Sequence, residues 1–190
     1  DLSQPETAGE LIAQTAAALG GPVSVLINSA AAFQMDNLRD LTPESWQYLI
    51  NVNAAAPVFL MQAFANQNPA PTDGAIINLL DTQLTSASPE RFSYFCGKFA
   101  LEGATRLAAY DLGPQGIRVN AIAPGLVLPS DQSQQNFDDR QALTPLDAGL
   151  GPADIVQAVQ YLIAARQVTG HTLVVDAGQQ LMGFGNAPIG

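Results

Sequence analysis

The sequence predicts an α/β fold with a parallel sheet between two layers of helices, on three observations. Short apolar runs rich in β-branched residues occupy 22–28, 75–80, 117–123 and 172–176, as expected of strands buried on both faces. Longer segments with helical spacing or helical end signals separate these runs. No internal repeat or domain linker interrupts the alternation. Strands that alternate with helices form parallel βα units, so we expect one domain over residues 1–190, a three-layer, doubly wound sheet of Rossmann type.

The first half of the chain predicts two helices around one strand. Apolar residues at helical spacing cover 5–19 and end at a glycine stop, Gly20. The apolar strand 22–28 follows directly. A threonine cap and a proline in the first turn then open a helix over 42–67. Pro57 lies inside this helix and predicts a kink or break near it.

The second half predicts two further helices and one long connection. The helix over 93–112 ends at the Gly-Pro-Gln-Gly sequence of 113–116. The segment 126–151 has mixed polarity and no sustained period, which predicts a long, mobile excursion. An amphipathic helix over 152–165 precedes the last strand.

Composition narrows the classes of partner. The formal charge of −10 argues against a nucleic acid or an anionic membrane as the main partner, and we expect no apolar run to approach the length needed to cross a bilayer. The only cysteine, Cys96, excludes an internal disulfide and suits the reducing cytoplasm. The only histidine, His171, excludes a multi-histidine metal site, so no metal is expected. These observations leave a cytoplasmic protein with a small-molecule partner.

Tyr94 and Lys98 are the residues most suggestive of chemistry. They stand at i and i+4 on a predicted helix and therefore share one face. An ammonium group near a phenol lowers the phenol pKa, and such a tyrosine can exchange a proton with a reacting oxygen or nitrogen. The same spacing also occurs in surface pairs without function, so both interpretations stay open on this pair alone.

Five short motifs lie beside the predicted strands and helices. They are Asn28-Ser29-Ala30-Ala31, Asn51-Val52-Asn53, the pair Tyr94 and Lys98, Pro124-Gly125, and Val175-Asp176-Ala177-Gly178. In order and spacing they resemble the motifs of the short-chain dehydrogenase/reductase family, over nearly the whole chain. The family counterparts are the Asn-Asn-Ala-Gly turn after its fourth strand, a helix with an active-site asparagine, the catalytic pair, the turn facing nicotinamide, and a final Val-Asp-Gly-Gly.

The resemblance implies a nicotinamide-dependent oxidoreductase, with NADPH as the expected cofactor and NAD possible. The catalytic residues would be Asn53, Asp81, Tyr94 and Lys98. The cofactor contacts would be Asp1, Leu2, Asn28, Ala30, Lys98, Pro124 and Gly125. Lys98 would hold the cofactor ribose and lower the Tyr94 pKa, and Asn53 would position Lys98 through a water. Residues 126–150 would form the substrate loop, with Leu126 touching the substrate.

One part of the family pattern has no counterpart here. The family begins with a glycine-rich turn that cradles the cofactor pyrophosphate at a helix N-terminus, and no segment of the chain matches it. Asp1-Leu2 instead resembles the end of the family's third strand. We therefore expect a sheet that lacks the first strands, and a chain that alone binds a dinucleotide poorly.

A second departure points to a substrate class. The family usually has a serine thirteen positions before the tyrosine, where this chain has Asp81. Aspartate there is typical of the pteridine reductases and the similar dihydromonapterin reductases, which also place an aromatic after the Asn turn, as Phe33 is placed here. A buried carboxyl can stay protonated and donate a proton, and a ring stack suits a flat pterin. Phe33, Asp81, Tyr94 and Leu126 are thus the expected substrate residues, although Ala31 replaces a serine of that branch.

Three functions follow as alternatives. The first is NADPH-dependent reduction of a dihydropterin to a tetrahydropterin, with Tyr94 as proton donor. The second is a general carbonyl or alcohol oxidoreductase of the same family. The third is a non-catalytic structural or binding subunit that keeps the fold. The resemblance also implies a homodimer or homotetramer. Its interface would form from the helix of the Tyr-Lys pair and from the long helix before it, each packed against its copy. The alanine-rich stretch 99–112 would permit these helices to approach closely.

Overall fold

Four parallel strands form the sheet at the centre of the computed structural model, which describes residues 1–71, 73–129, 134–146 and 149–182. The strands are β1 (Val25–Asn28), β2 (Gly74–Leu79), β3 (Ile117–Pro124) and β4 (Thr172–Val175), and they lie in the order of the sequence. The register pairs Ile27 with Ile77, and Ile77 with Asn120. All four predicted strands are present, with ends that differ from the prediction by up to three residues.

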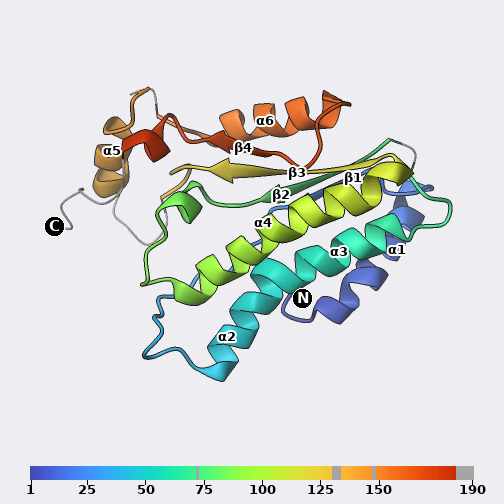
Figure 1. Cartoon of the computed structure of the whole chain (residues 1–190), viewed down its shortest axis with the longest axis horizontal. Coiled ribbons are helices and arrows are strands. Elements are labelled where there is room, and N and C mark those ends of the chain that lie inside the picture. The colour runs from blue at the N-terminus through green and yellow to red at the C-terminus, as the bar shows by residue number, and fades with distance from the viewer. Residues whose placement is uncertain (72, 130–133, 147–148, 183–190) are drawn as a thin grey trace.

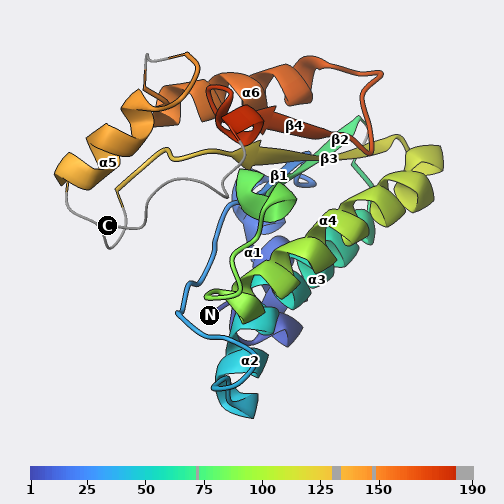
Figure 2. The ribbon, with the colours of Figure 1, turned by 60° about the vertical axis from the view of Figure 1, so that its left-hand side comes forward.

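Helices cover both faces of this sheet. On one face lie α1 (Ala8–Leu19), α3 (Ala56–Ala65) and α4 (Phe92–Leu112), and on the other lies α6 (Pro152–Ala164), as Figure 1 shows. Figure 2 shows the sheet between these two layers. The predicted three-layer α/β fold is therefore confirmed.

The core follows this layering. Phe64, Ile76 and Leu101 belong to a buried cluster between the sheet and the helices α1, α3 and α4. Ile77 and Leu162 belong to a smaller cluster between the sheet and α6. Ile76 and Ile77 point to opposite faces because side chains alternate along a strand, which explains the continuous apolar run at β2.

The helix predicted over 42–67 is one helix with a π turn inside it. The segments are α2 (Pro43–Ile50), the π turn η2 (Asn51–Ala55) and α3. Thr42 caps α2 as predicted, with Oγ1 accepting a hydrogen bond from Ser45 N at 3.2 Å. Pro57 has no N–H to donate to the preceding turn, and the extra residue of the π turn accommodates this. The irregularity expected near Pro57 therefore lies one turn earlier, around Asn53.

This continuous helix also changes one expectation. Pro43–Ala65 is 23 residues long and contains an 18-residue apolar window with a mean hydropathy of 1.3, enough by length and composition alone to cross a membrane. Half of the apolar window, 50 %, is buried inside the molecule, and the core helix of a soluble protein passes the same test. The expectation that no segment reaches this length was wrong, because the apolar stretch continues across the π turn.

The segment 126–151 contains a helix that the sequence did not predict. It is α5 (Gln134–Ala142), on which only Phe137 is buried. Its polar side chains pair one turn apart, as Gln134 does with Asp138 at 2.8 Å and Gln135 with Asp139 at 2.7 Å. Side chains at this spacing support a helix without any apolar stripe, so periodicity could not reveal it. Positions 130–133 and 147–148 of the expected substrate loop lie outside the described residues.

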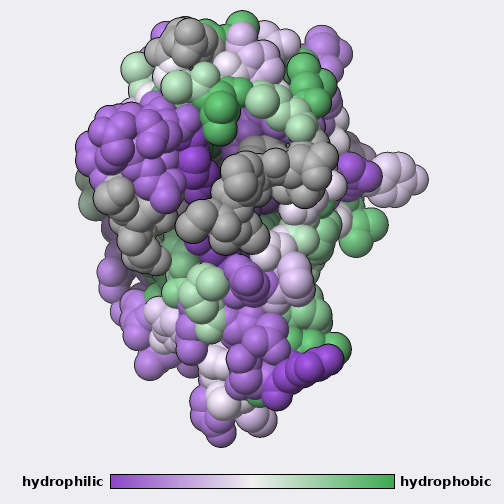
Figure 3. Space-filling model, turned by 90° about the vertical axis from the view of Figure 1, so that its left-hand side faces the viewer, coloured by the Kyte–Doolittle hydropathy of each residue, from purple (hydrophilic) through white to green (hydrophobic). Residues whose placement is uncertain are grey.

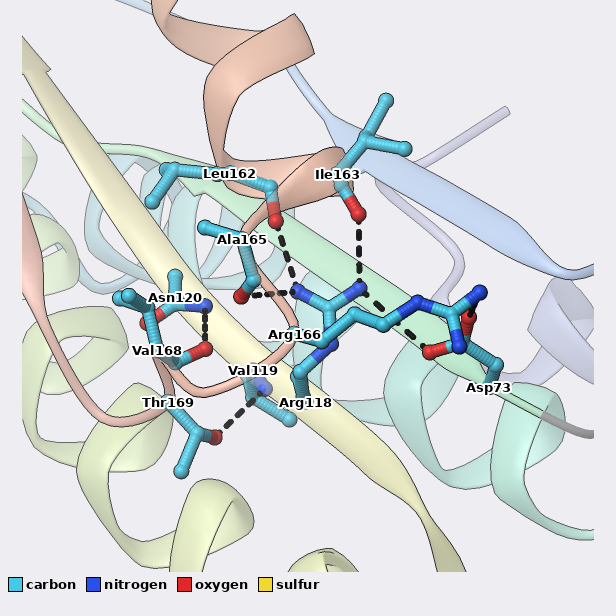
Figure 4. A network of polar contacts seen from close by, with 10 residues as sticks. All are labelled: Asp73, Arg118, Val119, Asn120, Leu162, Ile163, Ala165, Arg166, Val168 and Thr169. Carbon is cyan, nitrogen blue, oxygen red and sulfur yellow. Dashed lines mark hydrogen bonds and ion pairs between the residues drawn. The ribbon is translucent and has the colours of Figure 1, made fainter.

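Arg118 joins β3 to the end of α6. Its guanidinium donates to the carbonyl oxygens of Leu162 at 2.6 Å, Ile163 at 2.9 Å and Ala165 at 3.3 Å. Figure 4 shows the group lying among these carbonyls, with Asp73 and Arg166 beside it. The carbonyls of a last helical turn have no partner within the helix, so a buried cation there satisfies them.

Replacing Arg118 with leucine is expected to destabilise the fold by about 1–3 kcal/mol, because buried carbonyls lose their donors. Thermal unfolding measures this. Arg166→Leu is the matched control: its side chain is 75 % exposed and pairs with Asp73 at 2.9 Å. An exposed pair contributes about 1 kcal/mol or less. Equal losses in the two variants would contradict the capping role of Arg118.

Candidate active site

The carboxyl ends of the parallel strands meet at one edge of the sheet, where the segments after β1, β2 and β3 leave it (Figure 1). Figure 3 shows the molecule from this end, with hydrophilic side chains over much of the face and smaller hydrophobic patches between them. Ligands of open α/β sheets bind at this edge. The predicted substrate residues and the predicted catalytic residues Asp81, Tyr94 and Lys98 come from the segments that gather here and from the start of α4, whereas Asn53 lies in η2.

Asp81 and Tyr94 meet although thirteen positions separate them. Asp81 follows β2 and opens a short 3₁₀ helix, where its Oδ1 accepts a hydrogen bond from Gln83 N at 2.8 Å. Its second oxygen, Oδ2, accepts from the Tyr94 hydroxyl at 2.9 Å. The cap fixes one carboxyl oxygen and leaves the other directed at the phenol. The structure thus brings together the two groups expected to transfer the proton.

Phe33 completes a cluster with this pair. Its ring centroid lies 4.6 Å from that of Tyr94, with the planes tilted by 33°. Tyr94 is buried, with 2 % of its surface exposed, whereas Phe33 is 60 % exposed. The exposed Phe33 ring lies next to the buried Tyr94 phenol and the partly buried Asp81 carboxyl. It therefore offers an aromatic surface on which a ligand can stack. Phe33, Asp81 and Tyr94 therefore lie together as expected of substrate residues.

Burial governs the ionisation of this pair. It raises the pKa of the Asp81 carboxyl, against the opposing effects of the Gln83 amide, the Tyr94 hydroxyl and the charges of Lys98 and Arg91. Burial, followed by the charge and the hydrogen bond of Asp81, raises the pKa of Tyr94 well above that of a free phenol. Burial thus shifts the ionisation of both groups toward the proton-bearing form. The role of Arg91 had no signal in the sequence.

Lys98 does not act on Tyr94 as the sequence predicted. Its Nζ lies 5.8 Å from the centre of the Tyr94 ring and donates to the carbonyl of Leu79 at 2.7 Å. Burial lowers the pKa of Lys98 to about 8. The expectation that Lys98 lowers the Tyr94 pKa was wrong for this structure, because the loss of solvent and the nearby Asp81 dominate.

Asn53 lies in the π turn and holds the loop after β1. Its Nδ2 donates to the carbonyls of Ala32 at 2.8 Å and Leu49 at 3.0 Å, and its Oδ1 accepts from Ala32 N at 3.2 Å. Asn53 is fully buried, with 0 % of its surface exposed. Because Ala32 directly precedes Phe33, the Asn53 side chain fixes the start of the segment that carries the exposed Phe33 ring.

Three of the predicted cofactor residues line one cavity. Leu2, Asn28 and Ala30 border a cavity of about 290 Å³ beside β1. The Asn28 side chain itself points into the sheet, where its Nδ2 donates to Asn78 Oδ1 at 2.8 Å. Asp1 does not line this cavity, and its carboxylate accepts from Ser3 N at 2.9 Å. A larger groove of about 900 Å³ between α1 and α3 contains none of the predicted site residues.

The turn at Pro124-Gly125 packs tightly against the end of β4. Gly125 N donates to the Val175 carbonyl at 2.9 Å, and Leu126 N donates to Gln179 Oε1 at 3.0 Å. A Cβ on Gly125 would lie 2.8 Å from Asp176 Cα. This close approach explains why the position needs glycine. Gln179 is buried and holds the turn, a contact that the sequence motifs did not reveal.

Asp176 connects this turn to the catalytic segment. Its Oδ2 accepts from the hydroxyl of Thr82 at 2.8 Å and from Gln180 N at 2.8 Å. Thr82 follows Asp81 directly, so the end of β4 restrains the position of the carboxyl. Thr82 had no signal in the sequence, since its partner lies 94 positions away.

Gly125→Ala is expected to destabilise the fold by about 1–3 kcal/mol, because the added methyl overlaps backbone that cannot rotate away. Thermal unfolding and binding of the reduced nicotinamide cofactor measure the effect. Gly103→Ala on α4 is the control, since a Cβ there meets no atom within 4 Å. A Gly125→Ala variant as stable as Gly103→Ala would show that the turn is not tightly packed.

Comparisons with known proteins give matches over most of this chain. A family model described as enoyl-(acyl carrier protein) reductase matches residues 1–180. The chain is 32 % identical over 166 residues to galactitol 2-dehydrogenase (L-tagatose-forming) of Cereibacter sphaeroides, a match that covers 83 % of this chain and 65 % of that protein. The chain thus spans about two thirds of the length of that curated relative.

Two solved structures are similar throughout this chain. FolM alternative dihydrofolate reductase 1 from Brucella suis, in complex with NADP, is 33 % identical with a TM-score of 0.89, over 99 % of this chain and 74 % of that one. 4-Hydroxyisoleucine dehydrogenase complexed with NADH is 31 % identical with a TM-score of 0.80, over 94 % of this chain and 78 % of that one. Together with the five motifs and the Asp81–Tyr94 contact, these matches identify the chain as a member of the short-chain dehydrogenase/reductase family.

Proposed function

We propose that this chain carries the active site of an NADPH-dependent oxidoreductase that reduces a pterin-type C=N bond, converting a dihydropterin to a tetrahydropterin. The observation that carries the proposal is the cluster in which Tyr94 donates to Asp81 at 2.9 Å and the Phe33 ring lies 4.6 Å from the Tyr94 ring. A flat heterocycle with ring nitrogens needs an aromatic surface to stack on and a proton donor at its edge. The similarity to the FolM reductase supports this substrate class.

The residues present fit a nicotinamide cofactor. The Gly125 turn follows β3 at the ligand-binding edge of the sheet and is fixed there by its close packing against Asp176 and Gln179. Lys98 is buried and uses one of its three ammonium protons on Leu79, which leaves donors for ribose hydroxyls. Leu2, Asn28 and Ala30 border the cavity beside β1. NADPH is proposed as the cofactor because the FolM structure contains NADP, and NADH is the alternative.

The chemistry divides between cofactor and chain. When bound, the reduced nicotinamide supplies the hydride that adds to the carbon of the C=N bond. The chain supplies the proton at the nitrogen: the neutral Tyr94 hydroxyl gives it up, and the protonated Asp81 carboxyl next to it replaces it. Phe33 covers the pterin face and helps to keep water from the reacting atoms. Asn53 holds the loop that carries Phe33.

The substrate class is tested by assaying the complete protein with a dihydropterin and with a panel of ketones, each with NADPH and with NADH. We expect turnover of the dihydropterin with NADPH at a kcat/KM well above that of any ketone. Turnover of ketones alone would refute the pterin substrate and leave the family assignment in place. Turnover with NADH alone would refute only the choice of cofactor.

A general carbonyl or alcohol oxidoreductase is the second candidate. It is favoured by the similarity to galactitol 2-dehydrogenase (L-tagatose-forming), an enzyme that acts on a sugar alcohol. In that case Asp81 would replace a serine without a new role. The two candidates differ at Asp81: a ketone reductase should tolerate serine there, whereas a pterin reductase should not.

We further propose a homodimer or homotetramer in the cytoplasm, in which α3 and α4 pack against their copies. Leu107 and Tyr110 on α4 are 74 % and 89 % exposed, and both border a groove of about 700 Å³ between α3 and α4. Exposed apolar groups of this size are typical of association surfaces. The mass of the complete protein in solution tests this, and a monomeric mass would refute it.

A further inference from the structure

The helix that carries Tyr94 receives its N-terminal cap from a distant segment. At the start of α4, Arg91 makes no side-chain capping bond. Asp36, 57 positions earlier, accepts a hydrogen bond from Ser93 N through Oδ1 at 3.1 Å. Asp36 is buried, with 6 % of its surface exposed. A carboxylate satisfies a free amide of the first turn and interacts favourably with the positive end of the helix dipole.

The same residue also joins the two backbones. Asp36 N donates to the carbonyl of Glu90 at 3.0 Å, and Phe92 N donates to the carbonyl of Asp36 at 3.2 Å. These bonds form an isolated parallel bridge between Asp36 and Arg91. Asp36 thus takes part in three hydrogen bonds, two through its main chain and one through its side chain. We call this set of three bonds the Asp36 clasp.

The Asp36 clasp joins the two chain segments that carry the aromatic groups of the proposed site. Phe33 is three residues before Asp36, and Tyr94 directly follows Ser93. The hydrogen bonds between the two segments therefore lie close in sequence to both rings and help to maintain their contact at 4.6 Å. On the other side, Asn53 fixes Ala32, the residue before Phe33. The loop of Phe33 is thus anchored at both ends, once to η2 and once to α4.

We propose that Asp36 is a positioning residue that sets the location of the Tyr94 hydroxyl relative to Phe33, so that the stacking ring and the proton donor behave as one rigid unit. Its effect on turnover rests on the proposed function. Asp36 touches neither Tyr94 nor Asp81 through a hydrogen bond, and it acts through Ser93 and the first turn of α4. A misplacement of a proton donor by about 1 Å can cost about a hundredfold in rate.

The first test is kinetic. Asp36→Ala is expected to lower kcat for the dihydropterin by about 10- to 100-fold, to raise its KM several-fold and to leave the KM for NADPH unchanged. Asp36→Asn keeps an acceptor oxygen for Ser93 N and is expected to restore kcat to within about 3-fold of the wild type. In a Tyr94→Phe background, Asp36→Ala is expected to have no further effect on kcat. A full additional loss there would overturn the proposal.

A matched control separates positioning from stability. Asp154 accepts a hydrogen bond from Gly151 N at 2.8 Å at the start of α6, on the other face of the sheet. Asp154→Ala is expected to lower the melting temperature but to keep kcat and both KM values. If Asp154→Ala lowers kcat as much as Asp36→Ala does, the role of Asp36 is merely structural. If Asp36→Ala does not fold, Asp36→Glu replaces it: the longer side chain keeps the charge and is expected to shift α4 and lower kcat about tenfold.

A spectroscopic test needs no turnover. In the complete protein with labelled tyrosine, the ring resonance of Tyr94, assigned from the Tyr94→Phe variant, reports the neighbouring Phe33 ring. It is expected to shift in Asp36→Ala in the same direction as in Phe33→Leu, and to stay in place in Asp154→Ala. A shifted resonance in a protein that reduces no pterin would refute the proposed function and support the positioning role. An unshifted resonance, with normal pterin turnover in Asp36→Ala, would refute the positioning role alone.

Discussion

Tyr94→Phe is expected to lower kcat for the dihydropterin by about 10²- to 10⁴-fold, the range that general acid catalysis contributes. Phenylalanine keeps the ring contacts with Phe33 and Phe95 and removes only the hydroxyl that donates to Asp81. We therefore expect a folded protein with nearly unchanged binding of NADPH. Steady-state kinetics, with thermal unfolding as a check on folding, measure both effects.

Tyr110→Phe is the matched control for this substitution. Tyr110 lies on the same helix, but 89 % of its surface is exposed and it makes no contact with Asp81. The same loss of one hydroxyl there is expected to leave kcat unchanged. A Tyr94→Phe enzyme as active as Tyr110→Phe would support the non-catalytic subunit that the sequence left as an alternative.

Asp81→Ser is expected to reverse the substrate preference. In the proposed mechanism a protonated carboxyl replaces the proton that Tyr94 gives to the ring nitrogen, whereas a serine hydroxyl has a much higher pKa and can only orient a carbonyl oxygen. Dihydropterin turnover should fall by about 100-fold or more, while turnover of small ketones should stay level or rise. Serine can still accept the bond from Gln83 N, so the turn after β2 should persist. The ratio of the two kcat/KM values measures the reversal.

Asp40→Ser is the matched control, because Asp40 also accepts a hydrogen bond from a backbone amide in a turn. Asp40 accepts from Asn37 N at 2.9 Å in an exposed turn. Its replacement is expected to change neither the pterin nor the ketone activity. If Asp81→Ser also leaves the ratio unchanged, Asp81 has no role in selecting the substrate.

The sequence predicts the layers of the fold well because the pattern is local. The fully buried strand β2 appears as a continuous apolar run that includes Ile76 and Ile77, and Thr42 marks the start of a helix by its cap. Local patterns fail where a tertiary contact decides. The π turn around Asn53 depends on how the chain accommodates Pro57, and α5 has no apolar stripe to reveal it.

The candidate site shows the same difference between residues found from local patterns and residues placed by tertiary contacts. Tyr94 and Asp81 could be found from spacing and resemblance, and Phe33 from its place after the Asn turn. Asp36 and Thr82 could not, because their partners lie 57 and 94 positions away in the sequence. The sequence predicted a lowered pKa for Tyr94, whereas burial and the neighbouring Asp81 carboxyl raise it. Both causes come from tertiary packing, which the spacing of Tyr94 and Lys98 on one helix does not reveal.

The pH dependence of kcat/KM for the dihydropterin, in the wild type and in Asp81→Asn, tests the central claim most directly. Burial raises the pKa of Asp81, and in the proposed mechanism the proton-bearing carboxyl is the active form. Activity should therefore be full below this raised pKa and fall as the pH rises through it. Tyr94 should add no limb, because its raised pKa keeps the phenol neutral, whereas Lys98, with a pKa of about 8, can add one in both proteins.

We expect the limb that belongs to Asp81 to disappear in Asp81→Asn, together with most of the turnover, while a limb near the Lys98 pKa persists. A pH profile of Asp81→Asn that matches the wild type in shape and height would contradict the proposal that Asp81 and Tyr94 act as one proton-transfer unit.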